Sequence, residues 1–155
     1  MEWKRKIGLV TVMLLVLLLD RFTKAWISQQ LALGESQPII SGIVSLTLVH
    51  NPGAAFGLLA GRRWLFVLAV LVLIVLLLVY RKVLAEQATL SQYAIALLMG
   101  GVFGNLWDRV MLGYVVDFLD FHVWPVFNVA DAAIVCGALV LGWEVVRNER
   151  RTRPK

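Results

Sequence analysis

Residues 64–80 read WLFVLAVLVLIVLLLVY, a run of seventeen residues without a charged side chain. An α-helix needs about 17–25 mostly apolar residues to cross a bilayer, so this run is long enough. The whole chain has the same bias, because 60% of its 155 residues are hydrophobic and only 16% are charged. A soluble domain of this size cannot bury that much apolar surface. The composition excludes an ordinary soluble protein, a disordered chain and a disulfide scaffold, and it leaves a membrane protein.

Three more segments have the length and composition of membrane spans, at about 7–27, 93–107 and 129–146. The span at 93–107 is the least apolar, and it contains Gly100 and Gly104 at the spacing of a close helix contact. We therefore expect an all-α membrane protein with four transmembrane helices, forming a single integral membrane domain over residues 1–155.

The basic residues predict how these spans are oriented. Ten of the fifteen lysines and arginines lie before the first span, between the second and third, or after the fourth. Four spans place these three segments on one side, and an excess of Lys and Arg marks the cytoplasmic side. Both termini are expected there. The basic excess is thereby explained without nucleic acid, for which no basic soluble module is present.

The longest connection, about 28–63, is expected on the outer face. Its middle, Ile43–Val49, is β-branched and partly alternating, which is typical of a strand or hairpin. Asn51, Pro52 and Gly53 then form a turn signal. The small apolar residues 54–59 are typical of a segment that re-enters the interface. We expect a small β-type element and a short amphipathic segment on the outer face.

Two aspartates on the outer side are candidates for catalysis. Asp117 has apolar neighbours, Asp131 opens the fourth span, and only fourteen residues of sequence separate them. Two carboxylates that face each other in a dry site share one proton, which suits hydrolysis of a peptide bond by an activated water. No Ser/His/Asp pattern or metal-ligand spacing competes. Cys136, the single cysteine, is interpreted as core packing.

Asp131 and several other polar residues on the outer side also have a structural interpretation that requires no catalysis. Asn128 followed by Asp131 is the pattern of a helix N-cap with an acidic third residue. Arg109 can serve as a headgroup anchor. Asp20 and Lys24 are spaced as an i,i+4 ion pair, and structural support is the favoured interpretation there.

Five blocks of the sequence, taken together, resemble bacterial lipoprotein signal peptidase, or signal peptidase II. They are DRFTK (20–24), NPGAAFG (51–57), GNLWDR (104–109), VVDF (115–118) and FNVAD (127–131). The resemblance covers nearly the whole chain in order. In this family the stretch between the last two blocks is often longer than residues 120–126 are here.

The resemblance implies an intramembrane aspartic endopeptidase of the bacterial inner membrane, with its active site toward the outer face. It would remove the signal peptide from diacylglyceryl-modified prolipoproteins by cutting before the lipidated cysteine. Globomycin-type cyclic peptides would inhibit it. Asp117 and Asp131 would be the catalytic pair. Substrate-binding or dyad-orienting residues would be Asn51, Gly53, Asn105, Arg109 and Asn128.

The remaining expectations concern partners and rival functions. Membrane lipid and the prolipoprotein are the expected partners, with no cofactor and no metal, and a monomer is expected because nothing in the sequence demands a second subunit. Two other classes stay open from the residues alone. One is a proton-coupled small membrane transporter, which would require acidic side chains through the depth of the membrane. The other is a non-catalytic lipid-binding subunit, in which Asp117 and Asp131 would be dispensable.

Overall fold

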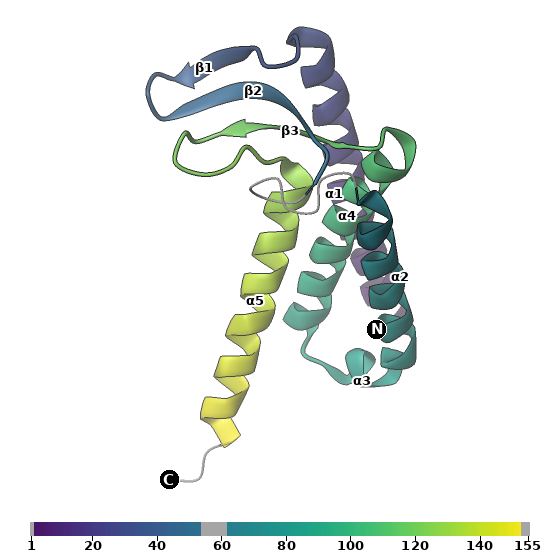
Figure 1. Cartoon of the computed structure of the whole chain (residues 1–155). Coiled ribbons are helices and arrows are strands. Elements are labelled where there is room, and N and C mark those ends of the chain that lie inside the picture. Colours follow the sequence, from purple (N-terminus) through teal and green to yellow (C-terminus); the bar gives the residue numbers. More distant parts are fainter. Residues whose placement is uncertain (1, 54–61, 153–155) are drawn as a thin grey trace.

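The computed structural model describes residues 2–53 and 62–152 and combines five helices with one small sheet (Figure 1). In chain order the elements are α1 (Glu2–Gln30), β1 (Ser36–Ile40), β2 (Val44–Asn51), α2 (Arg63–Val79), α3 (Arg81–Glu86), α4 (Thr89–Met111), β3 (Val115–Asp120) and α5 (Val129–Thr152).

Helices are present at all four positions where spans are predicted, namely α1, α2, α4 and α5. Within the described residues, one helical stretch, Val129–Asn148, is both long and apolar enough to cross a membrane by composition, and Trp64–Val79 is apolar but shorter. Charged Asp20, Arg21 and Lys24 interrupt the apolar sequence of α1. The short helix α3 was not expected from the sequence.

Helix α4 lies between α1 and α5 and contacts both through its glycines. A Cβ on Gly100 would lie 2.7 Å from the Val16 Cβ, and one on Gly104 would lie 2.6 Å from Asp20 Oδ2. Any larger residue would push α1 away from α4. The pair Gly100 and Gly104 therefore marks a close helix contact, as the spacing predicts.

The sheet covers one end of the helices. Its strands run antiparallel in the order β1-β2-β3, and Figure 1 shows them together beyond the ends of α1 and α5. A small core joins the sheet to the last turns of α1, with Ile27 and Leu31 packed against Leu48, Val116 and Phe118. The sequence predicts a strand around Ile43–Val49, and β2 occupies that place. Strands β1 and β3 were not predicted.

The start of α1, the end of α5 and the helix α3 all lie at the far end of the helices from the sheet (Figure 1). The arrangement puts the basic N-terminal, α3 and C-terminal segments at one end of the molecule. The re-entrant apolar segment expected at 54–59 falls outside the described residues. One interpretation is wrong: Cys136 is exposed on α5 and not packed in a core.

Candidate active site

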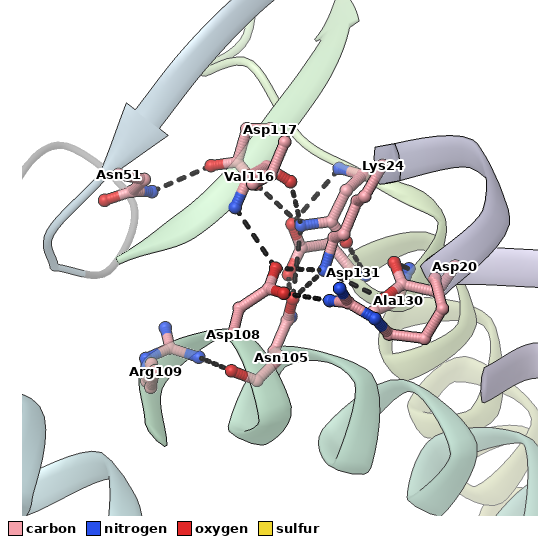
Figure 2. Close-up of polar contacts among 12 residues, drawn as sticks. Asp20, Lys24, Asn51, Asn105, Asp108, Arg109, Val116, Asp117, Ala130 and Asp131 are labelled. Carbon is pink, nitrogen blue, oxygen red and sulfur yellow. Dashed lines mark hydrogen bonds and ion pairs between the residues drawn. The ribbon is translucent and has the colours of Figure 1, made fainter. Parts of the chain in front are cut away.

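Asp117 is buried in the middle of β3, with 2% of its surface exposed. Its two carboxylate oxygens accept hydrogen bonds from amide side chains. The Asn51 Nδ2 donates to Oδ2 at 3.0 Å (Figure 2). The Asn128 Nδ2 donates to Oδ1 at 2.6 Å. These partners come from the end of β2 and from the start of α5. The Asp117 carboxylate thus accepts hydrogen bonds from two neutral side chains.

Asp131 lies in the first turn of α5, where Asn128 caps the helix. The Asp131 backbone N–H donates to Asn128 Oδ1 at 2.9 Å, and the Asn128 backbone N–H donates back to Asp131 Oδ2 at 3.2 Å. This reciprocal pair is a capping box, so the structural interpretation of the spacing is correct. It does not exclude a second role. Asp131 Oδ1 also accepts a 2.7 Å bond from Asn105 Nδ2, and the helix N-terminus favours negative charge there.

One cavity of about 260 Å³ is lined by both aspartates. Asn51, Gly53 and Arg109 line the same cavity, together with residues 124–127 of the connection between β3 and α5. Asn128 joins the two carboxylate residues, because its amide nitrogen donates to Asp117 and its amide oxygen accepts from the Asp131 backbone. The fold therefore brings the two aspartates to one polar hollow at the sheet end of the helices.

The surroundings of Asp117 make its proton hard to remove. Burial, followed by repulsion from the Asp131 carboxylate, raises the pKa of Asp117 from 3.8 to about 7. The hydrogen bonds from Asn51 and Asn128 act in the opposite direction and are outweighed. Near neutral pH, Asp117 is therefore available both with and without its proton, which is what a general acid–base pair requires.

Behind the cavity lies a second set of charges, here called the ion cluster. Lys24 Nζ pairs with Asp20 Oδ2 at 2.8 Å and with Asp108 Oδ2 at 2.9 Å, and Arg21 pairs with Asp108 Oδ1. Asp20, Lys24 and Asp108 are all at most 1% exposed. The i,i+4 ion pair of Asp20 with Lys24 is present as the spacing predicts.

The ion cluster also holds the backbone next to each candidate catalytic residue. Asp108 Oδ2 accepts the Val116 N–H at 3.2 Å, one residue before Asp117. Asp20 Oδ1 accepts the Ala130 N–H at 3.0 Å, one residue before Asp131. Strand β3 and the start of α5 are thereby tied to the same buried charges. The ion cluster fixes where the two carboxylates sit relative to each other.

Lys24 also determines which way the Asn105 amide faces. Lys24 Nζ lies 3.0 Å from Asn105 Oδ1, and an ammonium group can only donate. The oxygen of Asn105 must therefore face Lys24, which leaves its NH₂ group to face Asp131 (Figure 2). The orientation of a hydrogen-bond donor to Asp131 is set by a buried cation on α1.

Arg109 leaves the end of α4 and forms one side of the cavity. Its guanidinium donates to the Gly53 carbonyl at 3.2 Å and to the Asn105 carbonyl at 3.4 Å, and it lies 4.2 Å from the centre of the Phe66 ring. The Gly53 backbone is held in turn, because its N–H donates to Asn51 Oδ1 at 3.0 Å. The turn predicted at Asn51–Gly53 thus brings a backbone segment to the site.

The structure brings every residue of the sequence-based site into one connected network. The sequence reasoning missed two members, Asp108 and Arg21. Asp108 directly precedes Arg109 and shares a helix face with Gly104, so an acid in the last turn of a mostly apolar helix was the available signal. Among residues 2–53 and 62–152, no group of three His, Cys, Asp or Glu side chains could hold a metal ion.

Comparison with known proteins points to one family. The model of the signal peptidase (SPase) II family matches residues 12–147. A lipoprotein signal peptidase of Moorella thermoacetica is 49% identical over 134 residues, covering 86% of this chain and 89% of the relative. A lipoprotein signal peptidase of Halothermothrix orenii is 47% identical over 132 residues, covering 84% of this chain and 89% of the relative.

Two solved structures share the fold. Both are bacterial membrane enzymes determined by the in meso method, one at 2.3 Å and one at 1.9 Å resolution. The first superposes with a TM-score of 0.89 at 28% identity, covering 96% of this chain and 93% of the other. The second has a TM-score of 0.81 at 30% identity, covering 89% and 92%.

Proposed function

This chain belongs to the signal peptidase II family, and from that premise we propose that it is an intramembrane aspartic endopeptidase. Its substrate is a prolipoprotein that carries diacylglycerol on a cysteine, and it cuts the peptide bond just before that cysteine. The observation that carries this proposal is the placement of Asp117 and Asp131 on one cavity, where amide side chains contact both carboxylates.

In the proposed mechanism the pair holds one proton between its two carboxylates. Asp117, with its pKa near 7, is the protonated member. Asp131 is the ionised member, since it accepts N–H groups from Asn105 and from the first turn of α5. Asp131 takes a proton from a water molecule, whose oxygen attacks the scissile carbonyl. Asp117 donates its proton to the carbonyl oxygen.

The tetrahedral intermediate then collapses with the same two groups. The C–N bond breaks, Asp131 passes its proton to the leaving amine, and Asp117 recovers its proton from the hydroxyl that becomes the new carboxyl group. Atoms and protons balance, and the pair returns to its starting state. Asn51, Asn105 and Asn128 orient the carboxylates through the cycle. The guanidinium of Arg109 and the Gly53 backbone form the wall against which the peptide lies.

The proposal puts α1, α2, α4 and α5 across the bacterial inner membrane as four spans. The termini and α3 then face the cytoplasm, which agrees with the Lys and Arg distribution. The sheet and the cavity lie at the outer face. α2 has seventeen residues, which at about 1.5 Å per residue gives roughly 25 Å, close to the apolar thickness of a bilayer.

A lipid moiety on the substrate is supported by a second hollow beside the first. An apolar groove of about 360 Å³ runs between α2 and α4, lined by Trp64, Leu68, Leu71 and Val110. Arg109 lines both this groove and the cavity. A lipidated residue next to the scissile bond therefore has an apolar path that begins at the same guanidinium, which can donate to the ester carbonyls of a diacylglyceryl group.

The test uses the purified full chain in detergent micelles with a precursor supplied in two forms, with and without diacylglycerol. We expect cleavage of the lipidated form only, inhibition by globomycin, and a product whose mass places the new N-terminus at the lipidated cysteine. Binding of the lipidated precursor without any cleavage would favour a lipid-binding subunit. Proton or solute flux into vesicles without cleavage would favour a transporter.

A further inference from the structure

His122, two residues after the end of β3, has an unusual backbone conformation. His122 has φ of +62°, and among residues 2–53 and 62–152 it is the one non-glycine residue with positive φ. This conformation is costly for a residue with a Cβ and persists where surrounding contacts hold it. His122 belongs to none of the interactions assigned to the cavity. Its contacts therefore need their own explanation.

Three interactions fix His122 to the sheet. Its backbone N–H donates to Asp120 Oδ1 at 2.8 Å, and its ring Nδ1 lies 3.4 Å from the same oxygen. Ring Nε2 lies 3.2 Å from the Ser45 hydroxyl on β2. Thr47, also on β2, donates to Asp120 Oδ2 at 2.9 Å. We call Ser45, Thr47, Asp120 and His122 the rim latch.

The rim latch holds one end of a short loop, and backbone pairing holds the other. Residues 121–127 leave β3 and return beside it, where the Phe127 N–H donates to the Leu119 carbonyl at 3.0 Å and the Leu119 N–H donates back at 2.7 Å. The rings of Phe121 and Phe127 stack with centroids 5.6 Å apart. Both ends of the loop are therefore anchored, while Val123 at its tip is 91% exposed.

This loop matters because it forms one wall of the cavity. Trp124, Pro125, Val126 and Phe127 line the same hollow as Asp117 and Asp131. The position of this wall depends on where the loop leaves β3, and His122 sets that exit through its backbone and both ring nitrogens. A shift of the loop would change the width of the cavity without moving either carboxylate.

The order Ser45, His122, Asp120 is also that of a serine nucleophile with its base and orienting acid. The surroundings do not fit that chemistry. Ser45 is 4% exposed, and its strand is paired on both sides, with Pro38 of β1 and Asp120 of β3 opposite Ser45. A substrate carbonyl cannot reach its hydroxyl. What the three side chains can do is hold the loop, with Nδ1–H donating to Asp120 and the Ser45 hydroxyl donating to Nε2.

We propose that His122 is a positioning residue that, through Ser45 and Asp120, fixes the 121–127 loop as a wall of the substrate cavity and thereby sets affinity for the peptide. The part of this inference that concerns substrate rests on the proposed function. The part that concerns the loop does not, so the two are tested separately.

The first test measures kinetics on the lipidated precursor. His122→Gly removes the ring and suits a positive φ, but it also frees the backbone, whereas Ser45→Ala removes a contact of the ring without changing the loop. A defect common to both variants therefore comes from the lost contacts. We expect KM to rise about fivefold, with kcat within about twofold of the original, because hydrogen bonds that hold the wall are lost while the carboxylates stay in place. Ser45→Ala should raise KM in the same direction, and the double variant should show less than the product of the two effects.

The second test needs no enzyme activity. A spin label is placed at the loop tip by Val123→Cys in a Cys136→Ser background. We expect its mobility to increase in His122→Gly and in Ser45→Ala. The matched control is Gln37→Ala, an exposed position on β1 of the same sheet, which should leave both label mobility and KM unchanged.

Each outcome decides one part. An immobile label in His122→Gly overturns the latch. A mobile label with an unchanged KM overturns the role of the loop in substrate affinity. A fall in kcat alone would mean that His122 acts on the carboxylates and would also overturn the proposal. If the unmodified chain cleaves no lipidated precursor, the proposed function fails while the label experiment still reports on the latch.

Discussion

Four of the aspartates at the sheet end of the helices fall into two sets with different partners. Asp20 and Asp108 belong to the ion cluster, where each carboxylate meets a cation and also accepts a backbone N–H. Asp117 and Asp131, the cavity pair, accept hydrogen bonds from asparagine side chains instead, and both line a hollow. Aspartate therefore occurs both in a set of buried ion pairs and in a pair that lines a cavity.

The difference shows what turns a carboxylate from a structural group into a candidate for catalysis. A cation at close range pairs with a carboxylate and holds it in one place, as Lys24 does for Asp20 and Asp108. An amide donor orients a carboxylate without neutralising it. Burial, followed by repulsion from the Asp131 carboxylate, raises the pKa of Asp117 to about 7. The ion cluster ties two backbone segments in place, while Asp117 in the cavity pair can be protonated or ionised near neutral pH.

The largest expected effect is on catalysis at the cavity pair. Asp131→Asn keeps the size of the side chain and an oxygen that can accept the Asn128 N–H, so the start of α5 should be preserved. The base that activates water is lost, and we expect kcat to fall by about 10³-fold. Cleavage of the precursor is measured by its shift on a gel. Glu35→Gln, an exposed outer acid, is the control and should cleave normally.

The ion cluster should respond in stability. Asp108→Asn leaves Lys24 and Arg21 facing a neutral group in a buried site, and we expect the free energy of unfolding to fall by about 3–5 kcal/mol. Thermal unfolding in micelles measures this. Glu86→Gln on α3 is exposed and should shift the unfolding temperature little. A loss of unfolding free energy as small as that of the control would mean that the ion cluster does not stabilise the fold.

The pH dependence of stability should report on Asp117. Because the pKa of Asp117 is about 7 when folded against 3.8 for an ordinary aspartate, the folded state binds its proton more tightly. Stability from this group is complete below pH 4 and is lost as pH rises toward 7, by up to about 4 kcal/mol. Asp117→Asn should lack this slope. Parallel stability curves for the two proteins between pH 4 and pH 8 would contradict the assignment.

The smallest expected effect is at the apolar groove. Leu68→Trp should narrow the groove between α2 and α4 and raise KM about threefold for a precursor with long acyl chains. A short-chain precursor should be affected less. Leu76→Trp, exposed on the same helix and away from the groove, is the matched control. Equal effects of both variants, or no dependence on chain length, would remove the groove from the substrate path.

The sequence was a good guide to the helices and to the cavity pair, for physical reasons. Long apolar runs leave few alternatives to a helix, and scarce acids among them are conspicuous. Asp117 and Asp131 stood out because they are carboxylates with apolar neighbours on either side of a short connection. The capping of α5 by Asn128 was also readable, since N-cap chemistry is local.

Most of the parts that escaped prediction depend on contacts between distant segments. The ion pair of Arg21 with Asp108 joins residues 87 positions apart, and no spacing rule finds it. β3 was missed because its first four residues, Val115–Phe118, are all buried, so the segment lacks the polar and apolar alternation that marks a half-buried strand. The rim latch was missed because Ser45 and His122 are 77 residues apart. Local patterns identify single groups, and the fold decides which groups meet.

The central claim is that the cavity pair performs the chemistry while the ion cluster only supports it. The most direct test compares Asp117→Asn with Asp108→Asn on the same lipidated precursor, with each rate corrected for the fraction of folded protein. We expect Asp117→Asn to be folded and without detectable cleavage, and Asp108→Asn to be less stable but within about tenfold of the original rate per folded molecule. Turnover by folded Asp117→Asn at a rate comparable to that of Asp108→Asn would contradict the account.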